Sequence, residues 1–180
     1  VNPGANLKSF YALPENSSVV DVMASFEEYF VGIITQGGSC APVPGIGWVG
    51  GQCTLYPEKG YWLIVSSGGS FSIEDAFLVD PEMSYELGEG ANLISFPSAG
   101  SVGVSDGFPD DMEGSIVGVI TEGGSCAPHP DYGWVGGQCS FHGGKGYWII
   151  SNDNISFSYD LSTLSRTRVN DDFGLSYPED

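Results

Sequence analysis

Two cysteines that are followed by histidines are the residues whose types and spacing most readily suggest chemistry. Cys126 and Cys139 each have a histidine three positions later, and thiolate and imidazole ligands at such spacings can bind zinc. The same cysteine spacing of 13 recurs earlier, at Cys40 and Cys53, where valine and tyrosine replace the histidines. Cysteines that recur in pairs without their histidines favour disulfides over a zinc site.

The four cysteines allow three pairings. Because the chain repeats itself around them, we expect each repeat to close its own loop, through Cys40–Cys53 and Cys126–Cys139. A bridge of this span stabilises a fold by roughly 3 kcal/mol, mainly by restricting the unfolded chain. Disulfides form in oxidising compartments, so the sequence predicts a secreted or cell-surface protein.

Catalytic constellations are weak in this chain. His129 and His142 are its only histidines, so a Ser-His-Asp or Cys-His triad would have to use one of them. Paired carboxylates for glycoside hydrolysis are available among 23 acidic residues, but no pair stands out at matching positions of the repeat. We therefore expect no enzyme, and a glycoside-active enzyme is the less favoured alternative.

One acidic cluster has the ligand type that calcium prefers. Asp106, Asp110, Asp111 and Glu113 crowd a glycine-rich stretch, and carboxylate oxygens on a loop suit Ca²⁺. Only the glutamate has an acidic counterpart in the first repeat, and the spacing does not match an EF-hand. Solvated acids are the simpler interpretation, so calcium is the one cofactor that the sequence leaves open.

The charge of the chain argues against two classes of partner. Five basic residues stand against 23 acidic ones, a net charge of −18. Such a surface repels nucleic-acid phosphates and anionic lipid headgroups, so we expect neither as a partner. No run approaches the roughly 18 apolar residues of a membrane span, so we also expect no membrane insertion.

Aromatic side chains are better candidates for ligand contact. Four of them could present flat faces to a sugar ring or to a protein partner: Trp48, Trp134, Tyr61 and Tyr147. The two tryptophans stand in glycine loops, 47–51 and 133–137, where a disulfide would hold a rigid binding surface at little entropic cost. The alternative is that both tryptophans fill the core beneath these loops.

The two GYW motifs pose a question of orientation. Successive strand residues point to opposite faces, so the tyrosine or the tryptophan of each motif must enter the core. We expect Trp62 and Trp148 to face the core.

All these residues lie in a stretch that occurs twice. Residues 31–62 and 117–148 match at 22 of 32 positions with a constant offset of 86, which indicates a duplicated structural unit. The prediction is unit one over 1–86, unit two over 87–160, and a tail or the start of a further segment over 161–180. Because the chain opens almost directly in the repeat, we expect it to be a fragment of a larger secreted or surface protein.

Strand signals dominate both units. Runs rich in β-branched and aromatic residues predict strands at 31–35, 60–65 and 146–150. The one convincing helix covers 18–29, whereas the matching stretch 105–116 contains glycine and proline and supports a turn or two at most. The fold class is therefore mainly β (β-rich α+β), with each unit a small sheet or sandwich and one helix in the first.

Unit one lacks one strand that unit two should have. Residues 84–87 read as the first strand of a hairpin with 91–96, and the equivalent strand of unit one would lie before Val1. An open sheet edge at 7–10 would then allow the chain to self-associate by strand addition.

The order NLISFP, glycine loop, GWVG and KGYWI resembles a repeat family of secreted and cell-surface bacterial proteins, over residues 4–72 and 90–158. The best-matched residues are Trp48, Lys59, Gly60, Tyr61, Trp62, Trp134, Lys145, Gly146, Tyr147 and Trp148. Two features depart from the family pattern: Ala5 and Ala91 replace its usual aromatic residue, and the paired cysteines are additional.

The resemblance implies a non-catalytic, β-rich extracellular module. Together with the acidic, disulfide-linked repeat, it predicts an interaction or adhesion module that binds a glycan or a protein. The alternative is a structural spacer that assembles by strand addition.

Overall fold

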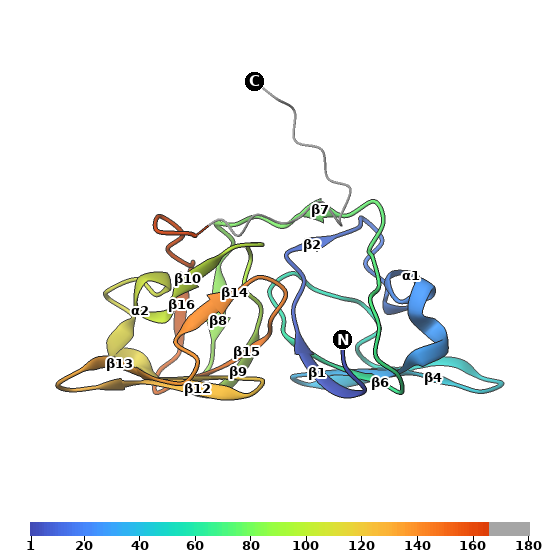
Figure 1. The fold of residues 1–180 in the computed structure, drawn as a ribbon, viewed down its shortest axis with the longest axis horizontal. Helices are drawn as coiled ribbons and strands as arrows, with labels where there is room; N and C mark the ends of the chain where they lie inside the picture. The colour runs from blue at the N-terminus through green and yellow to red at the C-terminus, as the bar shows by residue number, and fades with distance from the viewer. Residues whose placement is uncertain (166–180) are drawn as a thin grey trace, which may run out of the picture.

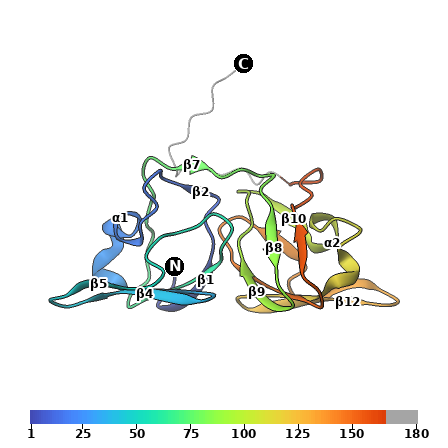
Figure 2. The same cartoon turned by 180° about the vertical axis from the view of Figure 1, so that it is seen from behind.

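The computed structural model describes residues 1–165 and shows a β-rich protein. Strands hold 44% of the residues and helices 10%, so the predicted fold class is confirmed. Figure 1 shows two halves side by side, each with a sheet along the lower edge of the view and its remaining elements above. The view from behind, in Figure 2, shows the same arrangement.

Each half contains a five-stranded antiparallel sheet with the same strand order. The order in unit one is β1 (Gly4–Lys8), β6 (Tyr61–Val65), β3 (Phe30–Thr35), β4 (Gly38–Val43) and β5 (Gly47–Gly50). The order in unit two is β9 (Gly90–Ile94), β15 (Tyr147–Ser151), β11 (Ile116–Thr121), β12 (Gly124–His129) and β13 (Gly133–Gly136). The registers also correspond: Leu7 pairs with Trp62, and Leu93, 86 positions later, pairs with Trp148.

Three two-stranded pairs complete the fold above the sheets. They are β2 (Ala12–Leu13) with β7 (Phe77–Leu78), β10 (Ser101–Gly103) with β14 (Ser140–His142), and β8 (Tyr85–Leu87) with β16 (Ile155–Phe157). The last pair places Tyr85–Leu87 in unit two. Unit one therefore ends before Tyr85, slightly earlier than the boundary at 86 that the sequence offset suggested.

The helical segment of unit one is divided into two pieces. The helix expected over 18–29 consists of α1 (Val19–Val22) and a 3₁₀ helix, η1 (Ala24–Tyr29), which meet at Met23. Ser18 caps α1 by accepting a hydrogen bond from the Asp21 amide. Unit two has an even shorter pair, α2 (Val104–Gly107) and η2 (Glu113–Ser115), in keeping with the turn or two of helix that the sequence allowed there.

Two separate apolar cores lie on the upper faces of the sheets. In β6, Tyr61, Leu63 and Val65 alternate inward, as Tyr147, Ile149 and Ser151 do in β15. The core of unit two is rich in stacked aromatic rings, including Phe96, Phe108, Phe141, Phe157 and Tyr159.

The two units meet through contacts that obey a local two-fold relation. The Gly146 amide donates to the Leu7 carbonyl at 3.4 Å, and the Gly60 amide donates to the Leu93 carbonyl at 3.2 Å. Subtracting or adding the offset of 86 converts each bond into the other, as at an isologous dimer interface.

Side chains extend the same symmetry at this junction. The Leu7 amide donates to Glu122 Oε2, and the Leu93 amide donates to Gln36 Oε1, both at 3.0 Å. The two side chains again stand 86 positions apart. The halves therefore pack against each other as two copies of one surface.

No helix within residues 1–165 is long and apolar enough to cross a membrane.

The close packing at the junction predicts that a residue larger than glycine at position 146 destabilises the fold. A Cβ there would lie 2.8 Å from the Lys8 carbonyl oxygen and 3.1 Å from a Leu7 methyl group. We expect Gly146→Ala to lower the free energy of unfolding by about 1–3 kcal/mol, because backbone or core must shift. The control is Gly137→Ala, where a Cβ meets no atom within 4 Å; its effect should stay within about 0.5 kcal/mol. Equal effects in urea unfolding would contradict this packing.

Candidate functional site

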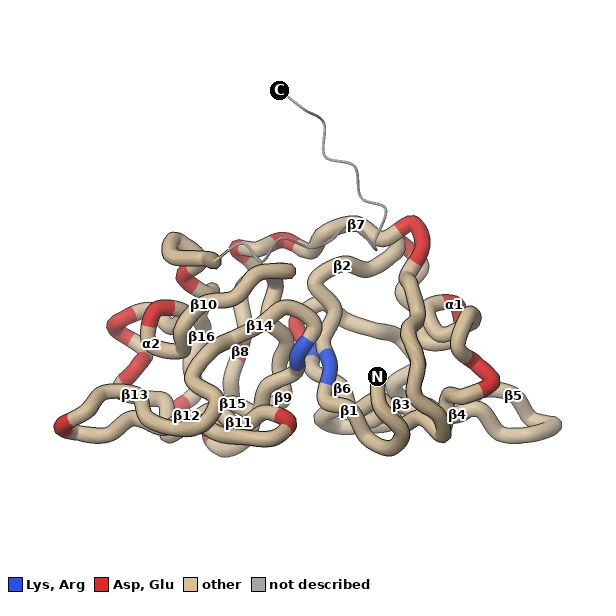
Figure 3. The backbone as a smooth tube through the Cα atoms, viewed as in Figure 1, with Lys and Arg blue, Asp and Glu red and all other residues tan. Residues whose placement is uncertain are grey.

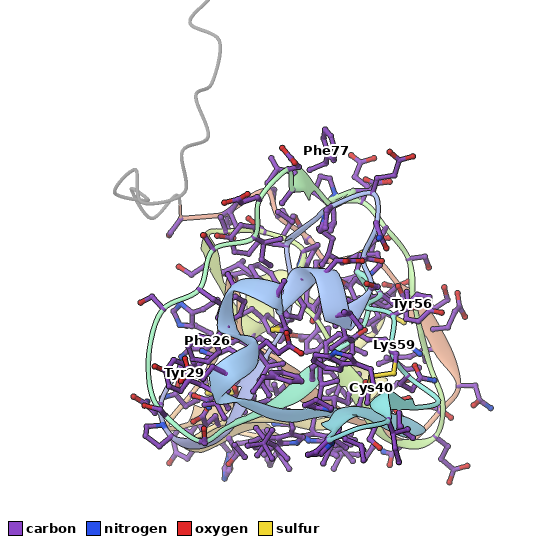
Figure 4. All side chains as sticks on the ribbon, turned by 90° about the vertical axis from the view of Figure 1, so that its right-hand side faces the viewer. Phe26, Tyr29, Cys40, Tyr56, Lys59 and Phe77 are labelled. Atoms are coloured by element: carbon purple, nitrogen blue, oxygen red, sulfur yellow. A yellow bond between two sulfur atoms is a disulfide. The ribbon has the colours of Figure 1, made fainter. Side chains whose placement is uncertain are left out.

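The disulfides pair as the repeat predicted. Cys40 is bonded to Cys53 and Cys126 to Cys139, with S–S distances of 2.00 and 2.01 Å. Figure 4 shows the Cys40 bridge beside the sheet of unit one. Both bridges use all four cysteines, so the zinc interpretation is wrong.

The hairpin next to each bridge requires glycine. Gly50 has a φ of 147°, and a Cβ there would overlap the Ser39 carbonyl oxygen of the neighbouring strand. Gly136 repeats this arrangement against Ser125. The predicted glycine loops are therefore edge strands, β5 and β13, held tightly against β4 and β12.

Trp48 and Trp134 face inward from these edge strands. Both are half-buried, and their rings lie 5.3 Å from Phe30 and 5.9 Å from Phe108. Trp134 Nε1 also donates to Glu113 Oε1 at 2.7 Å. Of the two roles that the sequence allowed them, the structure shows packing at the border of each core.

Tyr61 and Tyr147 lie at the centre of the cores with no exposed surface. The Tyr61 hydroxyl accepts a 2.7 Å hydrogen bond from the Tyr56 amide, and the Tyr147 hydroxyl accepts an equivalent bond from the His142 amide. Burial raises the pKa of both phenols, and these backbone hydrogen bonds partly oppose the rise. A ligand would reach either ring only if the core opened.

Trp62 and Trp148 point away from the cores, contrary to expectation. They pair across the sheets with Leu7 and Leu93 and are half-buried. Strand alternation requires one residue of each GYW motif to enter the core, but it does not choose between them. The tyrosine enters because its hydroxyl finds a backbone amide there.

The four acidic residues proposed for calcium do not form a site. Residues 1–165 contain no group of three or more histidine, cysteine, aspartate or glutamate side chains that could hold a metal ion. Glu113 instead binds the Trp134 indole, while Asp106, Asp110 and Asp111 are exposed. The sequence showed the acids but not their separation in space.

The face of the sheets opposite the cores is the candidate functional site. We call it the outer face; it is the side of each sheet that lies away from the core, the lower side in Figure 1, and it carries apolar side chains. Six of them are 41–49% exposed: Val31, Ile34, Val49, Val117, Ile120 and Val135. Four half-buried ones lie among them: Trp62, Ile64, Trp148 and Ile150.

Charged residues avoid this layer. Among the ten strands of the two sheets, only β1 contains a charged residue, Lys8 at its end. Figure 3 shows the blue lysines at the junction of the two halves and the red acidic residues mainly on the surrounding loops. In a chain of net charge −18, the outer face is thus an uncharged surface.

The outer face is also more constant between the units than the core is. Five apolar pairs on it are identical: Val31/Val117, Ile34/Ile120, Val49/Val135, Trp62/Trp148 and Ile64/Ile150. Val43, which alternation along β4 places on the same face, is replaced by His129. The core pairs change, for example Phe30 to Ile116, Leu63 to Ile149 and Val65 to Ser151. Sequence inspection could have noticed these identical apolar positions, but only the strand register shows that they share one face.

The lysines of the KGYW motifs serve the fold. Lys59 Nζ lies 4.7 Å above the Tyr56 ring and 3.5 Å from Gln52 Oε1 (Figure 4). A cation over an aromatic face is an attractive contact that holds this turn against the disulfide hairpin.

A cavity of about 830 Å³ lies in unit one, away from the outer face. Its lining is mixed: Phe10, Leu63, Phe71 and Ile73 are apolar, and Glu74 and Asp75 stand at its rim. These two carboxylates are exposed neighbours in sequence. Burial, which prepares a carboxylic acid for glycoside hydrolysis, is missing at both of them.

Searches with this chain found no matching protein-family model, no matching curated protein and no matching solved structure.

The buried phenols predict a loss of stability in alkali. Burial raises the pKa of Tyr61, Tyr85, Tyr147 and Tyr159 above their ordinary value of about 10. The folded state therefore keeps its phenol protons at a pH where the unfolded chain releases them. Stability should be unaffected by these groups below about pH 10 and fall above it by about 1.4 kcal/mol per pH unit for each phenol.

Urea unfolding at a series of pH values measures this slope. Tyr85→Phe should reduce the slope by about one phenol's share, and Tyr29→Phe, at a position that is 40% exposed, is the surface control. Phenolate absorbance that corresponds to all nine tyrosines before unfolding would contradict the burial of these rings.

The Trp134–Glu113 bond predicts unequal effects at the two edge tryptophans. Trp48 occupies the matching position, but within residues 1–165 its indole makes no corresponding bond to Glu27. We expect Trp134→Phe to cost about 1 kcal/mol more than Trp48→Phe, because a partly exposed bond to a charged acceptor is lost. The difference should vanish in a Glu113→Ala background, which removes the acceptor, as a double-mutant cycle would measure. A difference that persists there would assign it to packing instead.

Proposed function

We propose that this chain is a non-catalytic interaction module of an extracellular protein, and that its binding surface is the outer face. The observation that carries the proposal is the identity of five apolar pairs on that face, while many residues of the core differ between the units. These valine and isoleucine side chains point away from the cores, so core packing does not select them. Contiguous exposed apolar surface is a common mark of a protein interaction site.

The chemistry of the outer face favours a protein partner over a glycan. Val31, Ile34, Val49 and their counterparts supply no hydrogen bonds, which recognition of sugar hydroxyls requires. Trp62 and Trp148 are the aromatic residues on the face that could stack on a sugar ring, and both are half-buried. An apolar protein surface would match the whole face.

The size of the face suits a specific interface. Five strands about 4.8 Å apart and about five residues long cover roughly 400 Å². Two such sheets side by side offer about 800 Å², which is the area that each partner contributes to a standard protein interface. Sheets that pack face to face also form the cores of β-sandwiches.

The extracellular and non-catalytic parts of the proposal rest on other features. Two disulfides suit an oxidising compartment. The buried titratable groups of residues 1–165 with raised pKa values are tyrosine phenols in the cores, which have no access to a substrate.

Binding through the outer face can be tested with a second copy of the chain as the partner. We expect the protein to self-associate through the outer face in sedimentation velocity over the micromolar range. Raising the salt from about 0.1 M to about 1 M should strengthen association, because it shortens the screening length between acidic loops from about 10 Å to about 3 Å.

The matched variants are Ile34→Thr with Ile120→Thr, and Phe77→Thr as a control. Threonine keeps a β-branched side chain in the strand while it removes apolar surface. Phe77 is 69% exposed on β7, at the end of unit one opposite the sheet (Figure 4), so its loss should leave association unchanged. A wild-type protein that stays monomeric in high salt, or that associates as well with both isoleucines replaced, would contradict self-association through this face.

A further inference from the structure

The cavity of unit one corresponds to a filled space in unit two. There, Tyr85 of β8 lies inside the core, with its ring 5.5 Å from Phe157 and 5.2 Å from Tyr159. Its hydroxyl lies 2.8 Å from Ser95 Oγ, and its residue is 1% exposed. One strand therefore inserts a tyrosine that closes the core of unit two.

The residues that hold Tyr85 have counterparts around the cavity. Ser9, Phe71 and Ile73 stand 86 positions before Ser95, Phe157 and Tyr159, and all three line the cavity. Phe71 and Ile73 are only half-buried, whereas their counterparts are 5% exposed. Unit one thus has the walls of the tyrosine site without the tyrosine.

The first residue of the chain already occupies the ladder of the corresponding strand. In unit two, Leu87 pairs with Ile155 and Tyr85 pairs with Phe157. In unit one, the Val1 amine donates to the Gly69 carbonyl at 2.9 Å, and the Gly69 amide donates to the Val1 carbonyl at 3.1 Å.

Adding the offset of 86 to the Val1–Gly69 pair gives the Leu87–Ile155 pair of unit two. Continuing the ladder by two residues beyond Val1 brings a side chain opposite Phe71, where Tyr85 lies opposite Phe157 in unit two.

We propose that this cavity is an acceptor site for an extended peptide segment in line with Val1, with an aromatic residue two positions ahead of it. The segment adds a strand beside residues 69–71, and its aromatic ring enters the space between Phe10, Phe71 and Ile73. Main-chain hydrogen bonds supply affinity, and the aromatic pocket supplies specificity, as in other cases of strand addition.

An in-line segment suits the site better than a separate peptide. Val1 already holds the backbone direction and register, so a segment joined to it enters at a high effective concentration. The cavity, at about 830 Å³, also has room for several residues beyond one ring. In unit two, Met83, two residues before Tyr85, likewise packs against the core.

The experiment extends the chain with its own sequence. The six residues Pro-Glu-Met-Ser-Tyr-Glu, those of positions 81–86, are fused directly before Val1. The control extension carries alanine in place of the tyrosine and is otherwise identical. We expect the tyrosine extension to raise Tm by about 5–10 °C over the control, since filling an apolar cavity in a chain of this size has such an effect.

Hydrogen exchange locates the added strand. The amides of residues 71 and 73, which continue the ladder from the Val1–Gly69 pair, should become protected with the tyrosine extension and stay unprotected with the alanine extension. Equal Tm values and equal protection for the two extensions would overturn the proposal. A free peptide of the same sequence should leave Tm unchanged at micromolar concentration; stabilisation equal to that of the fusion would show that the site takes its strand from a separate molecule.

The acceptor site and the outer face are tested independently. The extension fills a core on the upper side of the sheet, so its effect on Tm does not depend on whether the protein associates through the outer face.

Discussion

The hydrogen bond between the Tyr61 hydroxyl and the Tyr56 amide orients β6, an interior strand of the sheet of unit one. With the phenol inside, Trp62 must lie on the opposite face of the sheet, and the residue before the tyrosine, Gly60, meets Leu93 at the junction. Three consecutive residues therefore serve the core, the outer face and the contact between units. Tyr147 and the His142 amide establish the same arrangement in unit two. If β6 and β15 were turned over so that their faces exchanged, each would bury its indole, expose its phenol and break the junction.

The lysines of this acidic chain gather at the junction. The backbone of Lys8 pairs with that of Lys145 in an isolated β-bridge, and the backbone of Lys59 pairs with that of Ile94 in the matching one. All three lysines of the chain therefore lie where the units meet. Acidic residues occupy the loops around the sheets, and their repulsion is spread over a surface that salt screens. The strands are left to uncharged residues. The apolar outer face is thus separated from the charges that keep the protein in solution.

The two units differ in how their cores are closed above the sheets. Unit two closes its core with Tyr85 and a dense cluster of aromatic rings, whereas unit one has Val1 at the start of the same ladder and a cavity beyond it. The outer faces, in contrast, are alike. A strand added to unit one would complete its core without changing the outer face, so assembly along the chain and binding through the sheets are physically separable.

The sequence by itself determined the features that depend on spacing. The offset of 86 predicted the disulfide pairing and the correspondence of the strands, because a duplicated unit keeps its covalent and hydrogen-bonded neighbours. The hairpin expected between 84–87 and 91–96 was wrong, since Tyr85–Leu87 pairs with Ile155–Phe157 instead. The offset did not determine where side chains point. Alternation along GYW is compatible with either face, and only the buried amide of Tyr56 selects the tyrosine. The four acidic residues within 106–113 are close in sequence, yet the distances between their carboxylates depend on how α2 and η2 are oriented. Glu113 accepts a hydrogen bond from the Trp134 indole instead. Tertiary structure decided these matters, because burial and register are properties of neighbours that lie far apart along the chain.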